Sequence, residues 1–138
     1  MELAFEQLSK HAKEPKLATN RSAGFDLFSS SIDDVIIAPG ENATIPTDIR
    51  VRYPKNTCGL IVARSGLATK NKLMVMGGLC DPDYEGGIRA ILFNAGSSPF
   101  IVSLGNRIAQ LVVIKCYFPS KKQIGKKRGH QGFGSSGL

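Results

Sequence analysis

Short apolar runs separated by turn residues limit the fold of this chain more than any other feature. Pro, Gly and Asn punctuate runs of Val, Ile, Leu and Phe, which predicts strands over residues 25–29, 34–38, 48–53, 58–63, 88–93, 100–104 and 107–118. Within 48–53, the apolar Ile49, Val51 and Tyr53 alternate with Arg50 and Arg52, as in a strand with one buried face. Short strands at this spacing indicate an all-β sandwich or barrel.

One short helix and one domain complete the expected organisation. Only residues 65–71 have a helical pattern, with Ser65 as the N-cap. A chain of 138 residues with 42% hydrophobic content can bury its own core. We expect a core domain over residues 1–118 and a flexible C-terminal arm over 119–138, because a basic, glycine-rich segment replaces the apolar pattern after Pro119.

The sequence also indicates where the protein works and what it contacts. No apolar run is long enough to span a membrane, and the N-terminus has no secretory pattern, so we expect an intracellular protein. Its three isolated cysteines predict free thiols in a reducing compartment. A net charge of +7 favours an anionic partner. Aromatic content of 7% without tryptophan argues against a single-stranded nucleic-acid surface.

The segment 128–138 carries four glycines, one arginine and one phenylalanine. Such a segment should become ordered only against a ligand or partner, since glycine loses the most backbone entropy on ordering. A guanidinium and hydroxyls suit phosphate, and the ring of Phe133 suits a planar group. At roughly 3.3 Å per extended residue, the arm can cross onto a neighbouring subunit or fold back on its own core. A plain linker is the alternative.

Three earlier segments carry candidate chemistry. Residues 63–67 place Arg64 and Ser65 where a strand meets a helix. This segment is either a phosphate-binding site or a plain helix N-cap with a surface arginine. Residues 77–87 form a candidate β-hairpin in which Asp81 and Asp83 serve as a base, as metal ligands or as turn formers. Asp26 lies between apolar residues, as a strand-end cap or as a buried anchor for a cation such as Arg64.

Residues 105–111 open the last long strand with the polar side chains Arg107 and Gln110. Read in order, these five segments resemble the five sequence motifs of the trimeric dUTPase family, the dUTP pyrophosphatases. Any one motif is weak, but five in sequence with family-like gaps are specific. The matching segments are residues 23–27, 64–67, 78–86, 105–111 and 128–137.

The resemblance implies a β jelly-roll homotrimer with three active sites at subunit interfaces, each closed by the C-terminal arm of another subunit. It implies hydrolysis of dUTP to dUMP and pyrophosphate, with Mg²⁺ held mainly by phosphate oxygens and water. The reaction keeps uracil out of DNA and supplies the thymidylate precursor. The expected partners are dUTP and further copies of the chain, without membrane or nucleic acid, and the expected compartment is the cytoplasm or nucleus, in the host cell if the protein is viral.

The resemblance also assigns roles to residues. Asp81 is the expected general base for the attacking water, and Asp26 is expected to act on the metal indirectly, through water, or by orienting Arg64. Tyr84 is expected on the deoxyribose, backbone near Gly78 on the uracil edge, Phe133 stacked on uracil and Arg128 on the terminal phosphate. The full expected substrate-binding set is Arg64, Ser65, Gly66, Gly78, Tyr84, Gln110, Arg128, Phe133, Gly134 and Ser135.

Three other functions compete with this interpretation. A dCTP deaminase shares the fold, but that family typically lacks the Asp-x-Asp-Tyr-x-Gly pattern of residues 81–86. A basic β-domain that binds nucleic acid needs more aromatic side chains. An inactive signalling relative would not need Asp81, Tyr84, Arg128 and Phe133 together.

Overall fold

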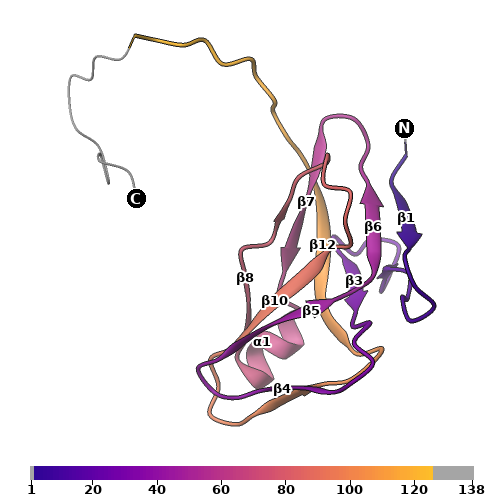
Figure 1. Ribbon diagram of the computed structural model, residues 1–138, viewed down its shortest axis with the longest axis vertical. Helices are drawn as coiled ribbons and strands as arrows, with labels where there is room; N and C mark the ends of the chain where they lie inside the picture. The colour runs from indigo at the N-terminus through magenta and orange to yellow at the C-terminus, as the bar shows by residue number, and fades with distance from the viewer. Residues whose placement is uncertain (1, 126–138) are drawn as a thin grey trace.

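The computed structural model describes residues 2–125, which form twelve strands and one helix (Figure 1). The elements in chain order are β1 (Ala4–Gln7), β2 (Lys16–Leu17), β3 (Phe25–Phe28), β4 (Val35–Ile37), β5 (Asn42–Pro46), β6 (Ile49–Arg52), β7 (Thr57–Val62), α1 (Ser65–Asn71), β8 (Leu73–Met76), β9 (Leu79–Cys80), β10 (Arg89–Asn94), β11 (Phe100–Val102) and β12 (Arg107–Lys115). The expected all-β class with one short helix is therefore confirmed.

The strands pair antiparallel in four sheets, of which the largest has the order β2-β3-β12-β7-β9. The others are β5-β10-β8, β1-β6 and β11-β4. Figure 1 shows β10 and β5 crossing obliquely over the layer that contains β3, β12 and β7. This is a sandwich-like arrangement in which the facing sheets enclose one apolar core.

The core follows from alternation along the strands. Ile49, Val51 and Tyr53 are at most 4% exposed, whereas Arg50 and Arg52 reach solvent, as the alternating pattern predicts. β12 lies between β3 and β7 in the large sheet, and its Ile108, Ala109 and Leu111 side chains are buried. The core cluster also takes in Leu27, Ile37, Ile45, Ile61, Ile88, Ala90, Leu92, Val102, Ile108, Ala109 and Leu111.

The helix begins and ends where the sequence predicts, but its cap is different. Arg64 is the N-cap, with extended backbone and no side-chain cap hydrogen bond, so Ser65 is the first helical residue and the predicted cap was wrong. The cause is that the Arg64 carbonyl already accepts the N–H of Ala68 at 2.9 Å. At the other end, Lys72 adopts a left-handed conformation with φ of 57°, which stops the helix.

The predicted β-hairpin over residues 77–87 is also wrong. Gly77 and Gly78 have φ of 64° and 106°, and they redirect the chain so that β9 joins the edge of β7. A Cβ at Gly78 would lie 2.4 Å from the Ile61 carbonyl oxygen, so this approach requires glycine. The Gly78 carbonyl in turn accepts the Ile61 N–H at 2.7 Å. The turn that follows thus projects from a sheet edge.

Two of the three cysteines are paired, which contradicts the expectation of free thiols. Cys58 and Cys116 form a disulfide with Cα atoms 6.1 Å apart, and Cys80 is free. Their separation of 58 residues hid the pair in the sequence. The antiparallel register of β7 and β12 places Cys58 opposite Ile114, so Cys116 lies only two residues beyond that partner.

After β12 the chain leaves the body of the fold as an extended segment without helix or strand through residue 125 (Figure 1). Arg128, Phe133, Gly134 and Ser135 lie outside the described residues. The division into a core and an arm at residue 118 stays a prediction. Within residues 2–125, no helix has the length and apolar character needed to cross a membrane.

Candidate active site

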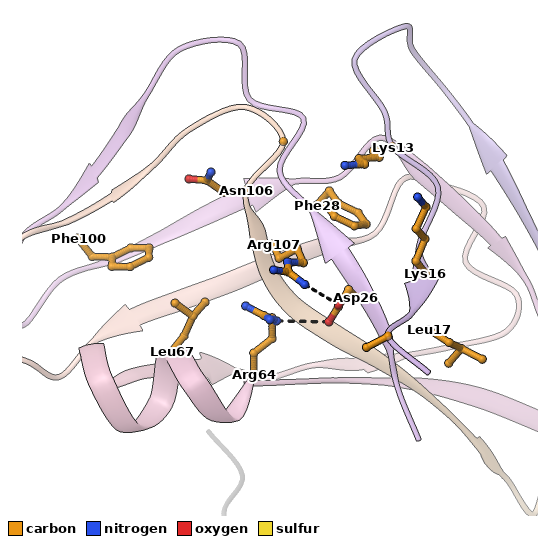
Figure 2. A pocket seen from close by; sticks show the side chains of 12 residues that line it. Lys13, Lys16, Leu17, Asp26, Phe28, Arg64, Leu67, Phe100, Asn106 and Arg107 are labelled. Atoms are coloured by element: carbon orange, nitrogen blue, oxygen red, sulfur yellow. Dashed lines mark hydrogen bonds and ion pairs between the residues drawn. The ribbon is translucent and has the colours of Figure 1, made fainter. Parts of the chain in front are cut away.

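Asp26 is the buried anchor of a three-residue charge cluster. β3 turns Leu27 into the core and leaves Asp26 and Phe28 on the opposite face. The Asp26 Oδ1 atom is 3.3 Å from Arg64 Nε, and Oδ2 is 3.7 Å from an Arg107 guanidinium nitrogen (Figure 2). Of the two predicted roles for Asp26, the structure shows the anchor. One carboxylate shared by two guanidiniums leaves the cluster with excess positive charge.

A polar row crosses the large sheet at this position. The strand register places Lys16 opposite Asp26 and Asp26 opposite Gln110, so all three side chains stand on one face. Gln110 donates from Nε2 to the Ala63 carbonyl at 3.1 Å. A Cβ at Gly24 would lie 2.7 Å from Gln110 Oε1, so glycine at this position makes room for the amide. Segments far apart in the sequence therefore meet here.

The start of α1 borders this row. Ser65 and Gly66 are exposed, and the first intrahelical hydrogen bond is donated by the Ala68 N–H. The amides before Ala68 consequently have no intrahelical acceptor and are available to an anion. Arg64, Ser65 and Gln110 thus all lie at or beside the end of β7, and the role in phosphate binding that the family resemblance implies stays a prediction.

A cavity of about 760 Å³ lies over the cluster (Figure 2). Its charged lining consists of one carboxylate and four cationic side chains. Small-molecule sites usually measure about 300–1,000 Å³, so the volume suits a nucleotide or part of one. The lining residues are Lys13, Lys16, Leu17, Ala18, Asp26, Phe28, Arg64, Leu67, Phe100, Gly105, Asn106 and Arg107.

Asp81 and Tyr84 lie on a different part of the surface. Asp81 is exposed in the turn after β9, and its carboxylate makes no ion pair or hydrogen bond with a side chain of residues 2–125. The Tyr84 N–H donates to the Asp81 carbonyl at 3.1 Å, and the Tyr84 hydroxyl donates to the Gly87 carbonyl at 3.2 Å. A Cβ at Gly86 would lie 2.4 Å from that hydroxyl. The ring therefore folds back over Gly86 while half of it stays exposed.

A second cavity, of about 300 Å³, adjoins this turn. Its lining is mostly apolar, with Leu79, Ile88 and Ile91 among the side chains, which suits a nucleobase and sugar better than phosphates. It is lined by Thr44, Leu79, Cys80, Asp81, Tyr84, Gly87, Ile88, Arg89 and Ile91.

The two cavities have no lining residue in common. Within one chain, the fold brings Asp26 and Arg64 together and brings Asp81 and Tyr84 together, but it does not join the two pairs. Gly78 lines neither cavity, and its carbonyl is already engaged by the Ile61 N–H. The predicted site is therefore split into two halves. We call the cavity around Asp26 and Arg64 the cationic half, and the cavity around Asp81 and Tyr84 the carboxylate half.

Burial raises the pKa of two titratable groups close to the carboxylate half, Tyr53 and Cys80. The Tyr53 hydroxyl is buried without a hydrogen-bond partner of normal geometry among residues 2–125, and it lies over Gly59. Burial, with a further contribution from Cys80, holds the pKa of Tyr53 well above its ordinary value. Burial also raises the pKa of the Cys80 thiol, and the charge of Asp81 adds to this. Cys80 therefore remains a neutral thiol next to Asp81 at neutral pH.

The carboxylates of the site suit a metal ion whose ligands are mostly water molecules and substrate phosphates. Within residues 2–125, no three His, Cys, Asp or Glu side chains gather as a metal site would require. Both Asp26 oxygens face guanidinium groups, and Asp81 is exposed. Mg²⁺ commonly keeps several waters and takes substrate phosphates with one or two carboxylates. The donor set suits that arrangement.

Sequence reasoning gave no role to Arg107, Lys13 or Lys16. Arg107 begins β12 and reaches Asp26 because the register shifts between Arg107 and Ala109, which a sequence does not reveal. Lys13 and Lys16 approach the cluster because β2 pairs with β3. Two basic residues in a short polar segment carry no signal by themselves.

Comparison with known proteins covers nearly the whole chain. A sequence model of the dUTPase family matches residues 10–137. The chain is 40% identical over 141 residues to the mitochondrial deoxyuridine 5'-triphosphate nucleotidohydrolase of Homo sapiens, covering 99% of this chain and 55% of the human one. It is 42% identical over 138 residues to the enzyme of the same name from Variola virus, covering 97% and 92% of the two chains.

Solved structures agree with the sequence comparison. The dUTPase from phage phi11 of S. aureus superposes with a TM-score of 0.82 at 25% identity, over 94% of this chain and 100% of the other. The dUTPase of Staphylococcus bacteriophage 80alpha with dUpNHpp gives 0.80 at 30% identity, over 99% and 98%. These similarities support the expected jelly-roll class, and the chain belongs to the dUTPase family.

Proposed function

We propose that this protein hydrolyses dUTP to dUMP and pyrophosphate by attack of water on the α-phosphate. Relatives named deoxyuridine 5'-triphosphate nucleotidohydrolase match it over nearly its full length. The observation that carries the proposal is the cationic cavity beside Asp26 and Arg64, at the end of the strand that leads into α1. Inside a cell, in the cytoplasm or nucleus, this activity would limit uracil in DNA and supply dUMP.

The reaction site is assembled between copies of the chain in a homotrimer. Support comes from the separation of the two cavities, since Arg64 lines one cavity and Asp81 lines the other. Exposed apolar side chains also mark the edge strands β8 and β9: Met74 is 55% exposed, Met76 44% and Leu79 66%. Apolar groups at unpaired sheet edges are typical of surfaces that another chain covers.

Asp81 is the general base. Its exposed, unpaired carboxylate can orient a water molecule and accept its proton as the water attacks in line. Arg64, the Ser65 hydroxyl and Gln110 of the adjoining chain counter the charge that develops on the phosphate. Mg²⁺ carried by the triphosphate supplies further charge neutralisation when it is bound.

Asp26 acts on Arg64 and, through water, on the metal. Its carboxylate is buried and contacts the Arg64 guanidinium, so it fixes the direction in which that cation points. Direct metal ligation is disfavoured because Arg107 engages the second oxygen. This arrangement keeps the guanidinium preorganised, and only the substrate's phosphates need to enter.

Selectivity resides in the carboxylate half. Tyr84, held over Gly86, presents its ring for the deoxyribose, where a ribose hydroxyl would be crowded. Backbone groups that line the second cavity, such as those of Gly87, offer the pairing edge for uracil, and cytosine would leave buried groups unpaired. Phe133 stacks on the base, Arg128 binds the terminal phosphate, and Gly134 and Ser135 close over the chain, as the family resemblance predicts.

Pyrophosphate release from dUTP, dCTP, dTTP and UTP, with Mg²⁺ and with EDTA, tests the proposal. We expect rapid release from dUTP alone and loss of turnover with EDTA, from a species that light scattering shows to be a trimer. Ammonia release from dCTP would instead identify a deaminase. No release from any of the four nucleotides by the trimer would contradict the proposal.

A further inference from the structure

The cavity beside Asp26 holds more positive charge than its own carboxylate can balance. Lys13, Lys16, Arg64 and Arg107 line it, and Asp26 is the single acidic residue in the lining. Both guanidiniums contact that carboxylate. Neither lysine makes an ion pair with a carboxylate of residues 2–125. Two uncompensated ammonium groups on one concave surface suit a multiply charged anion.

Lys16 belongs to the same row as the phosphate-binding side chains. It lies directly opposite Asp26 across β2 and β3, and Asp26 lies opposite Gln110 across β3 and β12. The lysine is therefore two strand spacings from Gln110, about 9.6 Å, on the same face of the sheet. An anion that begins at Gln110 and extends along the row would pass over the neutralised Asp26 and reach Lys16.

Lys13 is held at the wall of the cavity by an aromatic ring. Its Nζ atom lies 4.5 Å from the centroid of the Phe28 ring, and Phe28 is only 6% exposed. This cation–π contact limits the movement of a long side chain before any ligand arrives. Figure 2 shows Lys13 and Lys16 on the side of the cavity away from α1, with Arg64 at the helix start.

We propose that Lys13 and Lys16 bind the two outer phosphates of the substrate, which leave as pyrophosphate. The inference rests on the proposed function, because Gln110 and Arg64 define the α-phosphate end of the row. Lysine ammonium groups act as compact point charges with several donors, which suits freely rotating terminal phosphates. The cationic half thus extends from the reacting phosphate to the leaving group.

Isothermal titration of inorganic pyrophosphate into the full chain tests the inference directly. We expect Lys13→Gln/Lys16→Gln to raise the Kd for pyrophosphate about tenfold, since two charge-assisted contacts are lost. The matched control is Lys10→Gln/Lys70→Gln, which removes the same charge from two exposed lysines outside the cavity. That control should change the Kd by less than about twofold. Lys13→Arg/Lys16→Arg should restore binding.

Kinetics separate this inference from the proposed function. The Lys13→Gln/Lys16→Gln variant should raise the KM for dUTP and weaken inhibition by pyrophosphate while inhibition by dUMP stays unchanged. Unchanged pyrophosphate affinity in that variant, or an equal loss in the control variant, would overturn the assignment. If the wild-type chain bound pyrophosphate through these lysines but failed to hydrolyse dUTP, the proposed reaction would be wrong and the anion site would stand.

Discussion

The side chain of Gln110 occupies the space that a Cβ atom would fill at Gly24, with Oε1 only 2.7 Å from that position. Gly24 immediately precedes β3, which pairs with the β12 strand that carries Gln110, and the same amide donates to the Ala63 carbonyl. Glycine at position 24 therefore leaves room for the Gln110 side chain, which an alanine there would force to move. The site depends on a close approach that only the folded register creates.

Gly24→Ala should displace Gln110 and lower both stability and turnover. Overpacking at such a contact typically costs about 1–3 kcal/mol. The check is a double-mutant cycle of the free energy of unfolding with Gln110→Ala. The cost of Gly24→Ala should largely vanish in the Gln110→Ala background, because the clashing atoms are gone. An equal cost in both backgrounds would show that Gln110 is not the obstacle.

Asp81→Asn should bind nucleotide and lose turnover. Removal of a general base usually lowers kcat by about 10²- to 10⁴-fold, because the attacking water no longer gives up its proton to a positioned carboxylate. Measuring kcat with dUTP, and titrating the variant with a non-hydrolysable analogue, would separate the loss of turnover from any change in nucleotide binding.

Asp83→Asn is the matched control for that experiment. Asp83 is an exposed carboxylate in the same turn, so its substitution removes the same charge two residues away. Near-normal kcat in Asp81→Asn, or an equal loss in Asp83→Asn, would remove Asp81 from its assigned role.

Tyr53→Phe should leave the free energy of unfolding at pH 7 unchanged. The variant should also lose less stability than the wild type at alkaline pH. The pKa of Tyr53 and that of Cys80 are both raised in the folded chain, so the unfolded chain loses these protons first. Stability is therefore complete below the ordinary thiol pKa of about 8.5 and falls as the pH rises above it. Removing a buried hydroxyl without a partner should cost nothing.

Urea unfolding at pH 7, 9 and 10.5 measures this effect for the wild type and for Tyr53→Phe. The free energy of unfolding should fall less steeply with pH in the variant. A loss above about 1 kcal/mol at pH 7 would mean that the hydroxyl makes a stabilising hydrogen bond, contrary to its geometry here.

The sequence predicts those parts of the fold that depend on local pattern. Alternation identified the strand at Ile49 and Val51, and the helix Ser65–Asn71 has the predicted bounds. The predicted strands omit the short β2 and β9 and the apolar β8, as well as β1 (Ala4–Gln7) and β5 (Asn42–Pro46). In β1 and β5, polar residues or proline interrupt the apolar pattern. Those strands form because β6 and β10 provide partners from distant parts of the chain.

The same limit applies to the candidate site. Asp26 was predicted as a possible anchor for Arg64, and the family resemblance placed Gln110 with Arg64 at the phosphates, since each belongs to a recognisable motif. Lys16 and Arg107 required the register, because strand pairing across the sheet decides what faces Asp26. The disulfide of Cys58 was missed for that reason too, since its partner follows a strand that neighbours it only in the fold.

A subunit-mixing experiment tests most directly whether copies of the chain share one site. Asp81→Asn and Arg64→Gln chains would each be inactive alone. When the two are unfolded, mixed in equal amounts and refolded, about a quarter of the sites in a cyclic trimer should pair an intact Asp81 with an intact Arg64 from its neighbour. We predict recovery of about a quarter of wild-type dUTP hydrolysis. Activity that stays at the level of the separately refolded parents would contradict a shared site.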